Sequence, residues 1–143
     1  MQNFPIEYRH SADFAATRPT CAHRLRRIPT SPVNPGHTDN APAAIGAYSQ
    51  ATLAEGFLFT SGQLGLVPAT GALAEGVEAQ ARQAFANLEA ICAAAGTTLG
   101  NTVKMTIFLA DINEFAVVNK VMTEVMSEPY PARSCFAVAA LPK

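Results

Sequence analysis

The sequence predicts an α+β domain over residues 40–143, and three observations support this. Two short apolar runs flank the pair Glu55-Gly56, the pattern of a β-hairpin. Two later segments repeat apolar residues at spacings of three and four, as amphipathic helices do. An apolar run typical of a strand follows each helical segment. The order strand–strand–helix–strand–helix–strand predicts a mixed sheet with both helices on one face.

Composition and charge exclude several classes of function. The 143 residues suffice for one domain with a core, and 15% of them are charged. Residues 1–38 carry five arginines against two acidic residues, a net charge of +3. Residues 39–143 carry five basic against nine acidic residues, a net charge of −4, which argues against nucleic acid as a partner. All three histidines precede residue 39, so the domain itself offers no histidine for catalysis or metal binding.

Residues 1–39 differ from the rest in composition. They contain five prolines and an arginine cluster without a sustained apolar period, which predicts a disordered leader. An excess of arginine over acidic residues leaves an organelle targeting segment open as the alternative. The sequence contains no run of 18 apolar residues, so it predicts no membrane-spanning helix. The three cysteines have no CxxC spacing, which favours free thiols in a reducing compartment, here the cytoplasm.

The first half of the domain contains the predicted hairpin and the first helix. The hairpin covers residues 47–64, and Gly62, which ends its second apolar run, can bring bare backbone close to a ligand. A second turn is predicted over residues 67–71, where Pro and Gly coincide. An apolar stripe then predicts a helix over residues 76–95, with Cys92 in the core rather than reactive.

The second half repeats a strand and a helix. Residues 103–109 predict a largely buried strand. Asp111, with Glu114 three residues on, predicts the cap of a second helix that ends before Pro129. Its inner face is predicted to consist of Phe115, Val118, Met122, Val125 and Met126.

The stretch Tyr130-Pro131-Ala132-Arg133-Ser134-Cys135 delivers an arginine into the last predicted strand. Pro131 fixes its own backbone angle and favours an extended Tyr130, so the approach is rigid. A guanidinium at the start of an apolar strand requires an anionic partner. A ligand carboxylate is one candidate, and a structural salt bridge is the other.

Four stretches together are similar to the Rid (YjgF) family of enamine/imine deaminases. They are residues 41–50, ending in Gly46-Ala47-Tyr48-Ser49-Gln50; Phe59-Thr60-Ser61-Gly62-Gln63; Phe115-Ala116-Val117-Val118-Asn119; and residues 130–135 with Leu141-Pro142-Lys143. The resemblance implies a chorismate-mutase-like subunit that forms a homotrimer with clefts between subunits. It also implies hydrolysis of small 2-imino acids (2-iminobutanoate, 2-iminopropanoate) to 2-oxo acids and ammonia, without a cofactor or metal.

The resemblance assigns roles to five residues. Arg133 would hold the substrate carboxylate, and Tyr48 would line the pocket beside it. Gly62 and Cys135 would offer backbone contacts, and Asn119 would shape the wall. A purely structural core tyrosine is the alternative for Tyr48. Because the domain lacks histidine, a thiolate nucleophile at Cys135 is not favoured.

The chain departs from the family pattern at three places. Ala47 replaces a proline before the tyrosine, and Ala137 and Ala140 stand where an acid and an arginine are common. The family also continues past Lys143 through a strand that bears a glutamate thought to position water. The domain is therefore expected to be C-terminally incomplete and its catalysis impaired. A small-carboxylate binding or sensing module without turnover is the alternative function.

Overall fold

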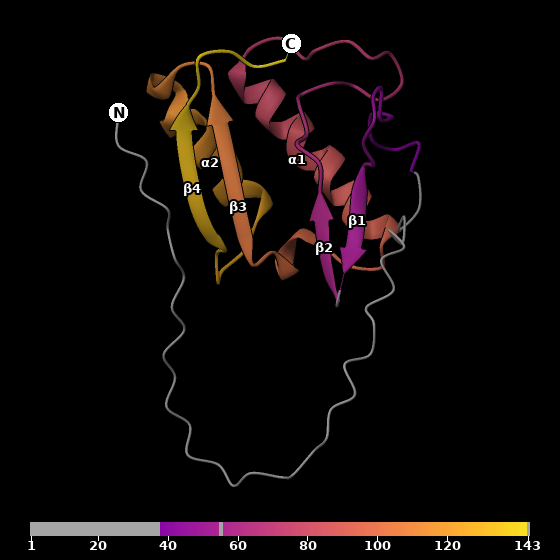
Figure 1. The fold of residues 1–143 in the computed structure, drawn as a ribbon. Helices are drawn as coiled ribbons and strands as arrows, with labels where there is room; N and C mark the ends of the chain where they lie inside the picture. Colours follow the sequence, from indigo (N-terminus) through magenta and orange to yellow (C-terminus); the bar gives the residue numbers. More distant parts are fainter. Residues whose placement is uncertain (1–37, 55, 143) are drawn as a thin grey trace, which may run out of the picture. The chain divides into compact units, whose positions relative to one another are not determined.

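The computed structural model describes residues 38–54 and 56–142, all within the unit Ser31–Lys143. Of the predicted leader, residues 1–39, only residues 38 and 39 belong to the described part of the chain. The described residues form four strands, two helices and two short 3-10 turns, and the strands and helices are labelled in Figure 1. In chain order these are β1 (Ala51–Ala54), β2 (Phe57–Thr60), α1 (Val77–Ala94), η1 (Leu99–Asn101), β3 (Lys104–Leu109), η2 (Ile112–Glu114), α2 (Phe115–Val125) and β4 (Ala132–Ala137).

The strands pair in two ladders. β1 and β2 are antiparallel, with Ala54 opposite Phe57, and Gly56 in the turn has a φ of 81° that suits glycine. β3 and β4 are parallel, with Met105 opposite Arg133. Antiparallel and parallel pairing together confirm the predicted α+β class, although the hydrogen-bonded ladders of the described residues are separate.

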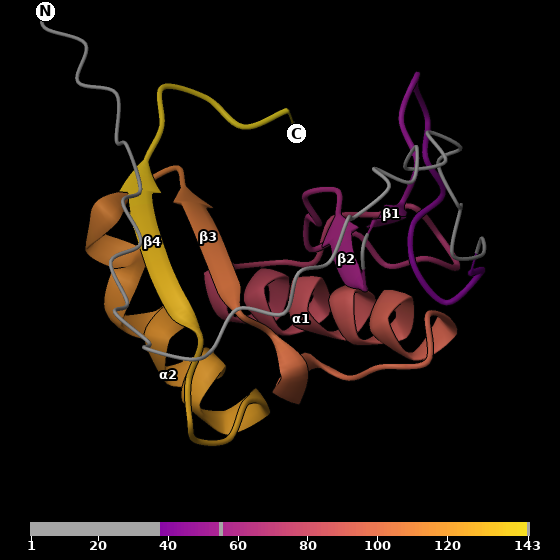
Figure 2. The ribbon, with the colours of Figure 1, turned by 60° about the horizontal axis from the view of Figure 1, so that its bottom comes forward.

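Both helices cover one face of the strands, as predicted (Figure 2). The main core joins Phe85 and Cys92 of α1 to Val121 and Met122 of α2 and Met105 of β3. Leu58 of β2 packs against this cluster and against a smaller one formed by Ala41, Ala51 and Ile91. No described helix has the length and hydropathy needed to cross a membrane.

The start and the inner face of α2 differ from the prediction. The Asp111 carboxylate accepts a hydrogen bond from the backbone N–H of Asn113 and caps η2, and α2 follows directly from that turn. Phe115 and Val125, predicted to face inward, are about two-fifths exposed at 38% and 40%. Val121 takes the central place instead, with no exposed surface. The buried residues of α2 are therefore Val118, Val121 and Met122.

The strands are buried on one face only, so the prediction of largely buried third and fourth strands is wrong. Residues 105, 107 and 109 of β3 alternate inward, while Phe108 on the opposite face is 55% exposed. Phe136 of β4 is 54% exposed, and Phe57 and Phe59 of β2 are exposed in the same way. These four phenylalanines, the outer aromatic face below, lie on the side away from the helices.

The segment after β2 docks closely on α1. A Cβ atom at Gly65 would lie 2.4 Å from the Cα atom of Gln80, so the added methyl group would clash with the backbone of α1. We predict that Gly65→Ala lowers the free energy of unfolding by about 1–3 kcal/mol, the usual cost of overpacking. Urea denaturation measures the loss. Gly62→Ala is the matched control, because that position opens into free space. Equal stability of the two variants would contradict the close approach.

Candidate active site

Arg133 lies near the start of β4 and its side chain reaches across to α2. The alternation of the strand turns Arg133 and Cys135 toward the helix side, like their partners Met105 and Ile107 on β3. The Arg133 Nη1 donates to the Asn119 Oδ1 at 2.8 Å and contacts the Met122 Sδ at 3.4 Å. Two residues predicted for the site, Arg133 and Asn119, are therefore in direct contact.

The partners of the Arg133 guanidinium are all neutral. Besides Asn119 and Met122, the Phe115 ring lies beneath it, with its centroid 5.1 Å from the Cζ atom. Within residues 38–54 and 56–142, no carboxylate lies within salt-bridge distance of this side chain. The alternative of a structural salt bridge therefore finds no partner among the described residues of the subunit. Amide, sulfur and ring hold the guanidinium in place, and none of them neutralises its charge.

The roles of Phe115 and Met122 beside the arginine did not emerge from the sequence, where both were assigned to packing. One signal was available for Phe115. It lies four residues before Asn119 and therefore on the same side of the helix.

Lys104 adds a second cation to the other face of the β3–β4 ladder, where its Nζ donates a hydrogen bond to the Ser134 Oγ at 2.7 Å.

Tyr48 and Gly62 belong to a different part of the fold. Tyr48 precedes β1 and Gly62 follows β2, and Figures 1 and 2 both show β1 and β4 at opposite ends of the row of strands. Tyr48 is 51% exposed, so the alternative of a core tyrosine is wrong. Gly62 is also exposed, with no atom near the position of a Cβ. The described subunit thus gathers Arg133, Asn119 and Cys135 in one group and leaves Tyr48 and Gly62 in another.

Cys92 lies in the core, as predicted, and is 7% exposed. Burial raises the pKa of its thiol, and the nearby Glu89 adds to the shift. A raised pKa leaves less thiolate at neutral pH, and thiolate is the species that reacts. We expect iodoacetamide to label Cys92 at least about tenfold more slowly than a small free thiol, and faster as the pH rises. Peptide mass spectrometry follows the reaction. Rapid labelling of Cys92 itself in the folded chain at neutral pH would contradict this burial.

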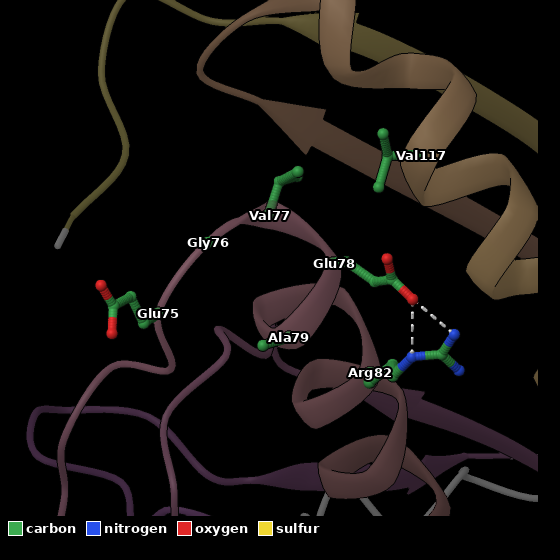
Figure 3. A pocket seen from close by; sticks show the side chains of 7 residues that line it. All are labelled: Glu75, Gly76, Val77, Glu78, Ala79, Arg82 and Val117. Atoms are coloured by element: carbon green, nitrogen blue, oxygen red, sulfur yellow. Dashed lines mark hydrogen bonds and ion pairs between the residues drawn. The ribbon is translucent and has the colours of Figure 1, made fainter.

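The hollow drawn in Figure 3 contains none of the predicted site residues. It lies where α1 begins beside α2 and is lined by Glu75, Gly76, Val77, Glu78, Ala79, Arg82 and Val117. Its charged groups largely satisfy each other, since Arg82 donates to the Glu78 Oε1 from Nη2 at 2.7 Å and from Nε at 3.2 Å. The hydrogen bond from Arg82 lowers the pKa of Glu78. Arg82 also reaches Glu124 on α2, so this network joins the two helices.

Comparison with known proteins identifies the family. The family model described as endoribonuclease L-PSP matches residues 38–143. A RutC family protein of Sinorhizobium fredii is 51% identical over 113 residues, which cover 78% of this chain and 89% of that protein. The 2-iminobutanoate/2-iminopropanoate deaminase of Salmonella typhimurium is 50% identical over 109 residues, with 74% and 85% covered.

Solved structures agree. RidA from the Antarctic bacterium Psychrobacter sp. PAMC 21119 superposes with a TM-score of 0.73 at 52% identity and covers 75% of this chain and 87% of its own. TdcF of Escherichia coli, solved with bound serine, gives a TM-score of 0.70 at 43% identity, with 75% and 87% covered. The chain belongs to the endoribonuclease L-PSP family, the family also called Rid or YjgF.

Proposed function

We propose that the chain hydrolyses small 2-imino acids, such as 2-iminobutanoate and 2-iminopropanoate, to 2-oxo acids and ammonia. The observation that carries the proposal is the Arg133 guanidinium held by neutral groups, which leaves its charge available to a substrate carboxylate. The deaminase names of relatives near 50% identity support the same reaction. The cytoplasm is the proposed location, which the free thiols of Cys92 and Cys135 suit.

The chemistry asks the protein mainly to orient its substrate. A guanidinium binds a carboxylate through two parallel N–H···O bonds, which fixes the neighbouring imine carbon. The protonated imine is already electrophilic. Water adds to its carbon, the C–N bond then breaks, and ammonia leaves with the proton while the carbonyl forms. Proximity and orientation supply much of the acceleration in such a site. The described residues provide the grip and the orientation, and neither step requires a redox cofactor.

We propose further that the complete cleft forms between copies of the chain in a homotrimer. Tyr48 precedes β1 and Gly62 follows β2, whereas Arg133 belongs to β4, which lies at the opposite end of the row of strands from β1 (Figure 1). The outer aromatic face supports assembly, because four phenylalanines at 54–60% exposure form an apolar surface that a second copy can cover. In this arrangement Arg133, Asn119 and Cys135 of one copy face Tyr48 and Gly62 of the next.

A coupled assay tests the function. Threonine dehydratase generates 2-iminobutanoate, and semicarbazide traps whatever imine survives. The purified chain is expected to shorten the imine lifetime and to lower the yield of the trapped product. An unchanged lifetime, under conditions in which a relative such as the Salmonella typhimurium deaminase shortens it, would refute the proposed reaction. Binding of 2-oxobutanoate without any turnover would favour the binding or sensing module instead.

A further inference from the structure

The buried amide of Gln50 closes the loop that carries Tyr48. Gln50 directly precedes β1, and its side chain is only 5% exposed, which is unusual for glutamine. Its Oε1 accepts a hydrogen bond from the Thr38 N–H at 3.0 Å. Its Nε2 donates to the carbonyl oxygens of Thr38 at 3.1 Å, Ala41 at 3.3 Å and Pro42 at 2.9 Å. One side chain thus binds the backbone of the segment on the far side of the loop.

The other end of the loop is bonded to Ser61, the residue directly after β2. The Ser61 N–H donates to the Gln50 carbonyl oxygen at 2.9 Å, and the Ser61 Oγ donates to the Ser49 carbonyl oxygen at 2.5 Å. Residues 43–48 therefore leave and return at one point, between Pro42 and Ser49. Gln50 lies at that point and is the residue that joins both ends.

The loop itself has little to hold its shape. Most of residues 43–48 are exposed. Two hydrogen bonds lie within it, from the Tyr48 N–H to the Gly46 carbonyl at 2.9 Å and, longer, from the Ile45 N–H to the Tyr48 Oη at 3.4 Å. Ala47 leaves the approach to Tyr48 without the rigidity that proline would give. The position of the tyrosine ring then depends on how firmly the two ends are held.

We infer that Gln50 is a positioning residue of the active site, acting through Tyr48. The inference rests on the proposed deaminase function, because Tyr48 matters only if it lines the cleft. Loss of the amide frees Thr38, Ala41 and Pro42 from β1, and the loop then samples positions in which Tyr48 no longer meets the substrate. Misplacement of a substrate-contacting group by about 1 Å can cost about 10²-fold in rate.

The test compares Gln50→Met with a matched control. Methionine keeps the length of the side chain and removes all four hydrogen bonds. Gln80→Met is the control. Gln80 lies on α1, and its side chain makes a single comparable hydrogen bond, from Nε2 to the Ala74 carbonyl oxygen at 3.0 Å. Gln50→Met is expected to lower kcat/KM for 2-iminobutanoate by about 10- to 10²-fold. Amide hydrogen exchange across residues 38–49, which include the Thr38 N–H that donates to Gln50, should accelerate in the same variant, while Gln80→Met changes neither quantity.

A double-mutant cycle separates positioning from general destabilisation. If Gln50 acts through Tyr48, Gln50→Met should cost less than about twofold in kcat/KM when Tyr48→Ala is already present. The same cost in both backgrounds would overturn the inference.

Should Gln50→Met fail to fold, Gln50→Asn replaces it, since the shorter amide cannot reach Thr38 and Pro42 together. If the unmodified chain has no deaminase activity, the proposed function fails by itself. The exchange rates still test whether Gln50 holds the loop, and unchanged exchange across residues 38–49 in Gln50→Met would overturn that role.

Discussion

Arg133→Ala is expected to lower kcat/KM for 2-iminobutanoate by about 30-fold or more, because truncating one partner of a desolvated charge pair costs about 2–5 kcal/mol and each 1.4 kcal/mol is a factor of ten. The same variant should lose measurable binding of 2-oxobutanoate by calorimetry. Its stability should change little. No described carboxylate would be left buried without a partner, and Asn119 lies in a half-buried place that water can reach.

Two further variants sharpen this prediction. Arg133→Lys keeps the charge but loses the planar fork, so we expect an intermediate loss of about tenfold in kcat/KM. Arg82→Ala is the matched control, because Arg82 is an exposed arginine that bridges Glu78 and Glu124 away from the site. It should leave kcat/KM unchanged. Full activity in Arg133→Ala, or an equal loss in Arg82→Ala, would show that the guanidinium does not hold the substrate.

The second large effect concerns stability, at Asn87. This residue has no exposed surface, and its Nδ2 donates to the carbonyl oxygens of Leu64 at 3.1 Å and Leu66 at 2.9 Å. Its Oδ1 accepts from the Gln83 Nε2 at 2.8 Å. Asn87→Ala leaves these buried groups without partners and opens space in the interior. We expect the free energy of unfolding to fall by about 2–4 kcal/mol.

Urea denaturation of Asn87→Ala beside Asn101→Ala measures this effect. Asn101 is an exposed asparagine with one side-chain bond, from its Nδ2 to the Thr97 Oγ1, so its loss should change stability by less than about 0.5 kcal/mol. Similar stability of the two variants would mean that Asn87 does not fasten the segment after β2 to α1. That segment includes Gly62, so a loosened Asn87→Ala should also bind 2-oxobutanoate more weakly.

The order and type of the elements could be predicted from the sequence because the apolar spacing is strong. The stripe of α1 and the burial of Cys92 followed directly from it. The polar residues that hold the fold together could not be predicted in this way. Gln50 and Asn87 are buried because particular carbonyl groups surround them, and those groups come from distant parts of the chain. Asn87 gave one signal, its spacing of three from Ala84 and four from Ile91 on the apolar stripe.

The candidate site was predictable only in part. Arg133 was predicted as a site residue from the rigid stretch that precedes it, and the structure adds its neutral partners Asn119, Met122 and Phe115. Neither composition nor spacing reveals that Tyr48 and Arg133 lie at opposite ends of the row of strands. That separation depends on how β1 and β4 are arranged in three dimensions, and on pairing between residues far apart in sequence.

Mixing two strongly impaired variants tests the central claim, that Arg133 of one copy and Tyr48 of the next serve one deaminase cleft. Arg133→Ala and Tyr48→Ala would be produced together in one cell and assayed for the lifetime of 2-iminobutanoate. In randomly mixed trimers, about a quarter of the clefts would receive an intact arginine and an intact tyrosine, so about a quarter of the original activity should return. Each variant alone should keep only a small residual activity. If the mixture is no more active than its components while the unmodified chain deaminates, the two residues do not share a cleft between copies.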